Sequence, residues 1–224
     1  MANTTIITAS NGYKYRPMKE SDYTFFMECW KDFPQGIQTY DVRTKRFSDF
    51  LQCNEGYGTE ALIKSGDVNN TDKCVTWTHI LEKADGTAVG VGVNVFAFNN
   101  EIFAKFGIIH PDHRGNKHWT AMEFMNLGLG ERVEVTYGYS WFYETNPVNG
   151  SFGAAARTKY DAAGIDISQT GKTVVTPVEN AADGVQFSTE EVNLQKNYST
   201  IAQYRTYKSN NSDWASVTYS YSST

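Results

Sequence analysis

The hydrophobic pattern near the start of the chain changes from a period of two to a helical period. Residues 13–16 alternate as a short strand does, and Pro17 interrupts the pattern. Glu20 and Asp22 follow, and acidic residues favour a helix N-terminus. The apolar positions after them fall at i, i+3, i+4, i+7 and i+10: Tyr23, Phe26, Met27, Trp30 and Phe33. The pattern therefore predicts a strand that leads into an amphipathic helix.

The next forty residues show weaker periodicity. Residues 40–53 place Phe47, Phe50 and Leu51 on one side and predict a second helix. Residues 54–73 are rich in Gly and Asn, which is typical of a long loop. Long loops in compact domains often serve as lids, binding loops or contact surfaces.

Three strands are predicted in the middle of the chain. Residues 74–81 alternate, and Asp85-Gly86 then favours a turn. Four valines share one face of the next segment: Val89, Val91, Val93 and Val95. Residues 102–109 supply the third strand. Together these segments predict an antiparallel meander.

The remaining pattern mixes helices with strands. Apolar residues at helical spacing begin at Trp119, and Gly128 and Gly130 are predicted to end that helix. A strand over 133–143 and an Ala-rich helix over about 152–163 follow. Three later segments favour further strands: 173–178, 192–197 and 201–208. This order predicts an α/β protein with a mixed sheet and helices on its faces.

Composition and charge narrow the classes of function. The chain has 224 residues, 40% of them hydrophobic, which suits one large globular unit, and its net charge is -5. Lysines and arginines form no basic stripe, so nucleic acid is not an expected partner. No apolar run reaches the roughly 20 residues that span a bilayer, and residues 1–10 lack a signal-peptide pattern. We therefore expect a soluble, cytoplasmic protein without a membrane partner.

Cysteine and histidine spacing does not predict a metal site. None of the three cysteines shows C-x-x-C spacing. His110, His113 and His118 straddle a turn, and their spacings suit no regular element. We expect buried thiols and solvated histidines.

The turn that contains the histidines is predicted to bind an anion. A helix N-terminus leaves N–H groups without partners and carries partial positive charge, and an adjacent arginine adds a forked donor for phosphate. The sequence "IIHPDHRGNKHW" resembles the acyl-CoA motif of the GNAT superfamily of N-acyltransferases. Four residues match that motif: Ile109, Pro111, Arg114 and Gly115.

The resemblance implies an acyl-CoA site with two departures from the family pattern. The pattern continues R-x-x-G-x-G, whereas this chain has Lys117 and Trp119 at the two glycine positions. Glycine permits close approach of a backbone to a ligand, so a tryptophan side chain could fill the space that a pyrophosphate needs. The main chain of Ile108 and Ile109 is implied to align the pantetheine arm. The residues implied to hold the pyrophosphate of acetyl-CoA, or of another acyl-CoA, are Arg114, Gly115, Asn116, Lys117, His118, Trp119 and Thr120.

Two further segments resemble the family in the correct order along the chain. "YKYRPMKESD" resembles its opening strand and first helix, and "RTKYDAAGI" resembles its late-helix pattern. The resemblance covers about residues 13–170 and implies a mixed, mostly antiparallel central sheet with helices on both faces. We expect residues 1–170 to form this domain, with an inserted loop at about 54–73. Residues 171–224 would supply its remaining strands and a polar, β-rich C-terminal extension.

Tyr160 takes the position of a tyrosine that, in family members, often protonates the departing CoA thiolate. A phenol holds its proton at neutral pH, but a tyrosine here could equally pack a helix onto the sheet. The usual positions of a general base correspond to Phe103 and Lys105. Three other residues could accept a proton through water, and the sequence selects none of them: Glu101, His110 and Glu144.

Two functions from different classes fit these observations. The resemblance implies an acyl-CoA-dependent N-acyltransferase, with acetyl-CoA or another acyl-CoA and an amine of unknown identity as its substrates. The altered glycines, the missing base and the Tyr/Ser/Thr-rich end favour a structural or interaction subunit of a larger assembly, conceivably a virus particle. Its protein partners would bind the inserted loop and the C-terminal extension. The retained Arg114, Gly115 and Tyr160 favour the enzyme.

Overall fold

The computed structural model describes most of the chain. The described ranges are 3–31, 40–56, 59–64, 75–97, 101–135, 137–143, 166–178 and 186–224. The helix predicted over 152–163, with Tyr160, and the candidate base Glu144 lie outside these ranges.

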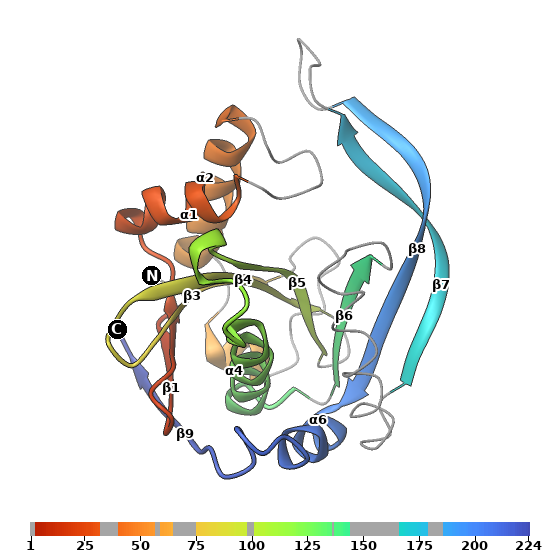
Figure 1. The fold of residues 1–224 in the computed structure, drawn as a ribbon. Helices are drawn as coiled ribbons and strands as arrows, with labels where there is room; N and C mark the ends of the chain where they lie inside the picture. Colours follow the sequence, from red (N-terminus) through yellow and green to blue (C-terminus); the bar gives the residue numbers. More distant parts are fainter. Residues whose placement is uncertain are drawn as a thin grey trace.

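Nine strands form one sheet in the order β7-β8-β6-β5-β4-β3-β2-β1-β9 (Figure 1). Every neighbouring pair is antiparallel except β5 and β6, which are parallel. The strands are β1 (Thr5–Ala9), β2 (Lys14–Pro17), β3 (Val75–Glu82), β4 (Ala88–Ala97), β5 (Glu101–Ile109), β6 (Tyr137–Tyr143), β7 (Asp166–Val178), β8 (Gln186–Thr200) and β9 (Tyr219–Ser223). The sheet is thus mixed and mostly antiparallel, as predicted. Because β9 pairs with β1, the two ends of the chain meet at one edge.

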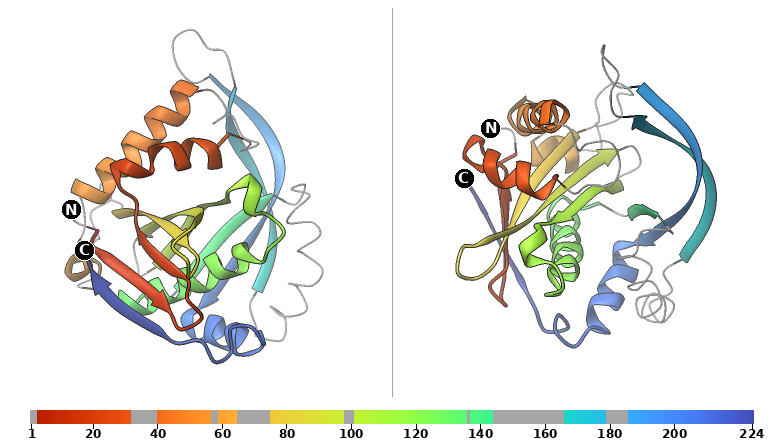
Figure 2. Two further views of the ribbon diagram at one scale, coloured as in Figure 1. Left: turned by 60° about the vertical axis from the view of Figure 1, so that its left-hand side comes forward. Right: turned by 45° about the horizontal axis from the view of Figure 1, so that its top comes forward.

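Helices cover both faces of the sheet. They are η1 (Glu20–Asp22), α1 (Tyr23–Cys29), α2 (Tyr40–Gly56), α3 (Glu60–Lys64), η3 (Pro111–His113), α4 (His118–Arg132) and α6 (Ile201–Ser209). In Figure 2, α1 and α2 lie on one side of the central strands, and α4 and α6 lie on the other. Each side has its own buried cluster, one around Phe26 and Trp30 and one around Met122 and Phe124. No helix of the described residues is both long and apolar enough to cross a membrane.

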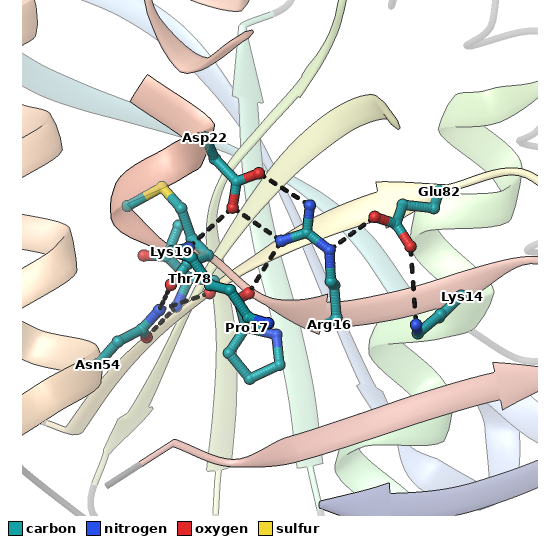
Figure 3. A network of polar contacts seen from close by, with 9 residues as sticks. Lys14, Arg16, Pro17, Lys19, Asp22, Asn54, Thr78 and Glu82 are labelled. Atoms are coloured by element: carbon teal, nitrogen blue, oxygen red, sulfur yellow. Dashed lines mark hydrogen bonds and ion pairs between the residues drawn. The ribbon is translucent and has the colours of Figure 1, made fainter. Parts of the chain in front are cut away.

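Arg16 links strand β2 to the start of the helices that follow it. Its guanidinium donates two hydrogen bonds to Asp22, at 2.7 and 2.8 Å, and one to Glu82 on β3 at 2.6 Å (Figure 3). Burial alone would lower the pKa of Arg16, but the bonds to the two carboxylates raise it overall. Arg16 of the R-P pair and Asp22 at the acidic start of the helix therefore belong to one ion network with Glu82. This network holds α1 against the sheet.

Asn54 attaches α2 to the sheet. Its side chain is fully buried, and its amide accepts from the Thr78 N–H and donates to the Thr78 carbonyl, both at 2.8 Å. It thereby pairs with one residue of β3 much as a neighbouring strand would. Asn54 was predicted to begin a loop, but α2 continues to Gly56 and α3 follows at Glu60, so that prediction was wrong for these residues.

Three other sequence predictions also need correction. The strand predicted over 201–208 is α6, because Thr200 and Gln203 cap a helix there. Gly128 and Gly130 lie inside α4, where they leave room for Tyr219 and Ile201 respectively. The four valines do not share one face, since Val91 and Val93 lie in the cluster on the α1 side whereas Val89 lies in the other. Strand β1 was not predicted.

We expect His79 to make the fold sensitive to acid. The side chain is fully buried and stacks on Tyr15 with ring centroids 4.6 Å apart, and burial lowers the pKa of His79 to about 3. The unfolded chain takes up this proton below about pH 6.5, so folded stability falls as pH drops from there, by about 1.4 kcal/mol per pH unit. Urea unfolding between pH 7 and 4.5 measures the loss. His79→Phe should flatten the dependence, whereas parallel curves for the two proteins would assign it to other groups.

Candidate functional site

Strand β5 is paired along its whole length on one side and only at its start on the other. It pairs with β4 from Glu101 to Ile109. It pairs with β6 only over residues 101–104, and the rest of β6 pairs with β8 alone. The register with β4 shifts between Val93 and Asn94, which makes Lys105 the extra residue of a bulge. The two parallel strands therefore separate just after Ala104, toward their C-terminal ends.

Beyond Ala104, no described strand pairs with the main-chain groups on this side of β5. The His110 N–H donates to the Val89 carbonyl at 2.9 Å, so with this register His110, Ile108 and Phe106 direct their main-chain groups to β4. The Ile108 carbonyl accordingly lies beside Gly90 of β4. By the same alternation, Gly107 and Ile109 direct theirs to the β6 side. Of the two residues predicted to make main-chain contacts, Ile109 is therefore the one on that side.

The turn after β5 is fixed by its own polar side chains. His110 Nδ1 accepts from the Asp112 N–H at 3.3 Å, and Arg114 Nε donates to the Ile109 carbonyl at 3.1 Å. The amide of Asn116 donates to the carbonyls of His113 and Arg114, at 3.3 and 3.2 Å. These bonds hold the Arg114 side chain at the end of β5, beside the start of α4.

The turn then enters α4 through two residues with positive φ. Gly115 has φ 80 and Lys117 has φ 60. No heavy atom lies within 4 Å of a Cβ placed on Gly115, so the space on that side of the turn is open. Lys117 stands at the first glycine position of the family pattern and adopts the left-handed conformation that glycine favours. Lys117 therefore has a backbone conformation that a glycine at this position would favour.

The N-terminus of α4 presents donors. The first of its N–H groups with a backbone acceptor is that of Ala121, which bonds to the Lys117 carbonyl at 3.1 Å. Lys117 provides no side-chain cap. Within the described part of the chain, the N–H groups of His118, Trp119 and Thr120 have no acceptor, and they carry the positive end of the helix dipole.

The Trp119 side chain packs against the sheet. Gly107 of β5 lies beneath it, and a Cβ placed on Gly107 would come within 2.8 Å of the indole ring. The N–H groups of a first helical turn point along the helix axis, whereas this ring extends sideways to β5. Trp119 stands where the pattern has a glycine on the helix, and Gly107 is a glycine on the strand opposite it. The indole ring fills the space above Gly107.

The other predicted contacts divide into inward and outward groups. His118 is buried, with its Nδ1 2.8 Å from the Tyr13 hydroxyl, and burial, together with His113 and Lys83, lowers its pKa. Thr120 is half-buried in the first turn of α4. Only Arg114, Gly115, Asn116 and Lys117 are exposed, so the His118 side chain is better placed to anchor the turn than to meet a ligand.

The described residues do not select a general base. His110 is half-buried and stacks on Phe25 with ring centroids 5.4 Å apart, and Glu101 lies at the opposite end of β5 from the turn. The histidine rings pack against one another, with centroids of His110 and His113 5.5 Å apart. No three His, Cys, Asp or Glu residues of the described ranges come together as metal ligands do.

The sequence pattern did not predict two residues at the candidate site. Gly107 could have been suspected, because an isolated glycine in a strand often marks close approach of another element. Asp213 could not, since it lies 96 positions from Lys117, whose Nζ it meets at 2.6 Å. Tertiary packing alone brings them together.

No protein-family model and no curated protein matches the sequence. Solved structures do match the fold. The spermidine/spermine N-acetyltransferase SpeG from Vibrio cholerae superposes with a TM-score of 0.51 at 13% identity, covering 86% of this chain and 95% of that one. A mutant of the same enzyme gives 0.55 at 11% identity, with 86% and 96% covered. A dodecameric form gives 0.51 at 12% identity, again with 86% and 96% covered. The chain has the GNAT acyl-CoA N-acyltransferase fold.

We expect Gly107 and Trp119 to be energetically coupled. Gly107→Ala should destabilise the protein by about 1–3 kcal/mol, because its methyl group meets the indole ring. In a Trp119→Ala background the same change should cost much less, since the ring is gone. Urea unfolding of the two single variants and the double variant measures this coupling. An equal cost in both backgrounds would mean that the ring lies elsewhere.

Proposed function

We propose that this protein is an acyl-CoA-dependent N-acyltransferase, with acetyl-CoA as its first candidate donor. One observation carries the proposal: β5 separates from β6 after Ala104, and the side of β5 without a described strand partner leads to a helix N-terminus whose first N–H groups have no acceptor among the described residues. An extended thioester arm with a diphosphate at one end needs such a combination. Main-chain donors would align the arm, and the turn would hold the diphosphate.

The described residues fit a diphosphate at the turn. The N–H groups of residues 118–120 and the open side of Gly115 permit close approach of an anion. Arg114 and Lys117 add positive charge beside them. Ile109 and Gly107 would meet the pantetheine arm through main-chain groups, while Trp119 and His118 hold the helix in place from the inner side.

The proposed chemistry is direct transfer. The nitrogen of a neutral amine attacks the thioester carbonyl carbon, the carbon–sulfur bond breaks, and an amide and a CoA thiolate result. The amine loses a proton to water or to a base that the described residues do not identify. Tyr160, by resemblance, would give its phenolic proton to the thiolate. The protein's contribution would be mainly positioning and stabilisation of the oxyanion.

Spermidine is the first acceptor to assay. The three solved structures described above are spermidine N-acetyltransferases, and an identity of 11–13% supports the fold and not the acceptor. A panel of a polyamine, an aminoglycoside and an N-terminal peptide would separate the main classes of amine. Release of free CoA thiol reports turnover for each of them.

Arg114 should contribute directly to donor binding. Isothermal titration with CoA should show binding by the wild type and about tenfold weaker binding by Arg114→Ala, because a charge-assisted contact to phosphate is lost. Arg205→Ala is the matched control, since Arg205 is an exposed arginine on α6 that pairs with Glu131. Absence of heat and of thermal stabilisation at millimolar CoA would overturn the proposed function.

Tyr160→Phe separates catalysis from binding. If the phenol protonates the thiolate, this variant should lower kcat about 100-fold while CoA affinity stays within about twofold. Steady-state thiol release and CoA titration on the same preparation measure the two quantities. Unchanged kcat would remove Tyr160 from the mechanism without affecting the proposed site.

A second function is favoured by the charge at the turn. The Asp213 carboxylate forms an ion pair with the Lys117 ammonium. The chain also has no glycine at the two glycine positions of the R-x-x-G-x-G pattern. These features suit a protein that has this fold and lacks the chemistry, acting as a binding subunit of an assembly. Under that alternative, the wild type binds no CoA.

A further inference from the structure

Lys117 and Asp213 form an ion pair beside the proposed diphosphate site. The Lys117 ammonium lies 2.6 Å from the Asp213 carboxylate, and both side chains are more than half exposed, at 77% and 53%. The pair raises the pKa of Lys117, first through the hydrogen bond and then through the charge of Asp213. Lys117 is therefore a cation whose charge is already matched before any ligand arrives.

The structure fixes Asp213 in this position through its neighbours. Trp214 is buried, and its ring packs against Tyr13 and Phe124 with centroids 5.8 and 5.1 Å away. Asn211 is also buried, and its side chain accepts from the Asp213 N–H at 3.3 Å. The segment between α6 and β9, which passes below α4 in Figure 1, is thus anchored on both sides of Asp213.

Strand β9, which follows that segment, is bonded to α4. The hydroxyls of Tyr219 and Tyr221 donate to the carbonyls of Phe124 and Gly128, at 2.6 and 3.0 Å. Because α4 carries Lys117 at its N-terminus, the helix and the segment that supplies Asp213 are held in one arrangement. The packing of the surrounding residues therefore holds the Asp213 carboxylate beside Lys117.

Resting on the proposed function, we propose that Asp213 competes with the donor's diphosphate for Lys117 and so sets the affinity of the site. A diphosphate must displace the carboxylate before it gains the ammonium, and it also meets the carboxylate's repulsion. The Lys117 side chain would then turn from Asp213 to the ligand. Because the pair is exposed, its effect is modest and depends on salt.

Four variants test the competition by titration with CoA at low ionic strength. Asp213→Asn keeps the shape of the side chain and removes its charge, and it should bind CoA about threefold more tightly than the wild type. Lys117→Gly removes the ammonium and keeps a residue that favours positive φ. In the double variant, the gain from Asp213→Asn should shrink. Asp49→Asn is the matched control, since Asp49 pairs with Lys45 at 2.9 Å on α2, away from the turn.

The outcomes distinguish this inference from the function on which it rests. If the wild type binds no CoA and no inorganic pyrophosphate, the proposed site itself fails. If the wild type binds CoA but Asp213→Asn gives equal or weaker binding, with unchanged ligand-free thermal unfolding, the competition is overturned. An equal gain with and without Lys117 would also overturn it, because Asp213 would then act by repulsion alone.

Discussion

The candidate site depends on one strand, β5, that among the described residues keeps one neighbouring strand along its whole length and loses the other partway. A buried strand needs its N–H and C=O groups paired, and β4 satisfies one side of β5 from end to end. On the other side β6 satisfies only the first four residues, because it then pairs with β8 alone. The bulge at Lys105 falls where the pairing stops. On this side the Ile109 carbonyl accepts from Arg114, and the main chain of Gly107 and the Ile109 N–H are the groups that the proposed function assigns to the donor's arm.

Helix α4 supplies the second half of the candidate site, and contacts at both ends of the helix set its position. Gly128 lets the Tyr219 ring approach the helix, and Gly130 does the same for Ile201. At the other end, Met122 and Trp119 pack onto glycines of β4 and β5. These close contacts define where the first turn of the helix opens. Glycines at these positions therefore determine where the N–H groups at the start of α4 lie.

Local sequence pattern predicted the strands of the meander and the turn at Arg114, because alternation and turn residues act over short distances. It failed where tertiary contacts decide. Asn54 appeared to start a loop, yet its pairing with Thr78 extends α2. The segment 201–208 alternates weakly like a strand, yet the cap at Thr200 makes it helical. The glycines of α4 signalled a helix end, although packing against Tyr219 and Ile201 explains them.

The two departures from the glycine pattern have different physical consequences. The Trp119 ring fits against β5 because Gly107, which has no side chain, lies beneath it. The R-x-x-G-x-G pattern instead has its glycine on the helix, at the position of Trp119. Lys117 has a left-handed backbone and places a positive charge beside the N-terminus of α4. That charge is matched by Asp213, which the C-terminal segment holds in place through Trp214 and Asn211. The C-terminal segment thus adds β9 to one edge of the sheet and also places the negative charge of Asp213 beside Lys117. A change in the packing of this segment would therefore alter the charge at the turn.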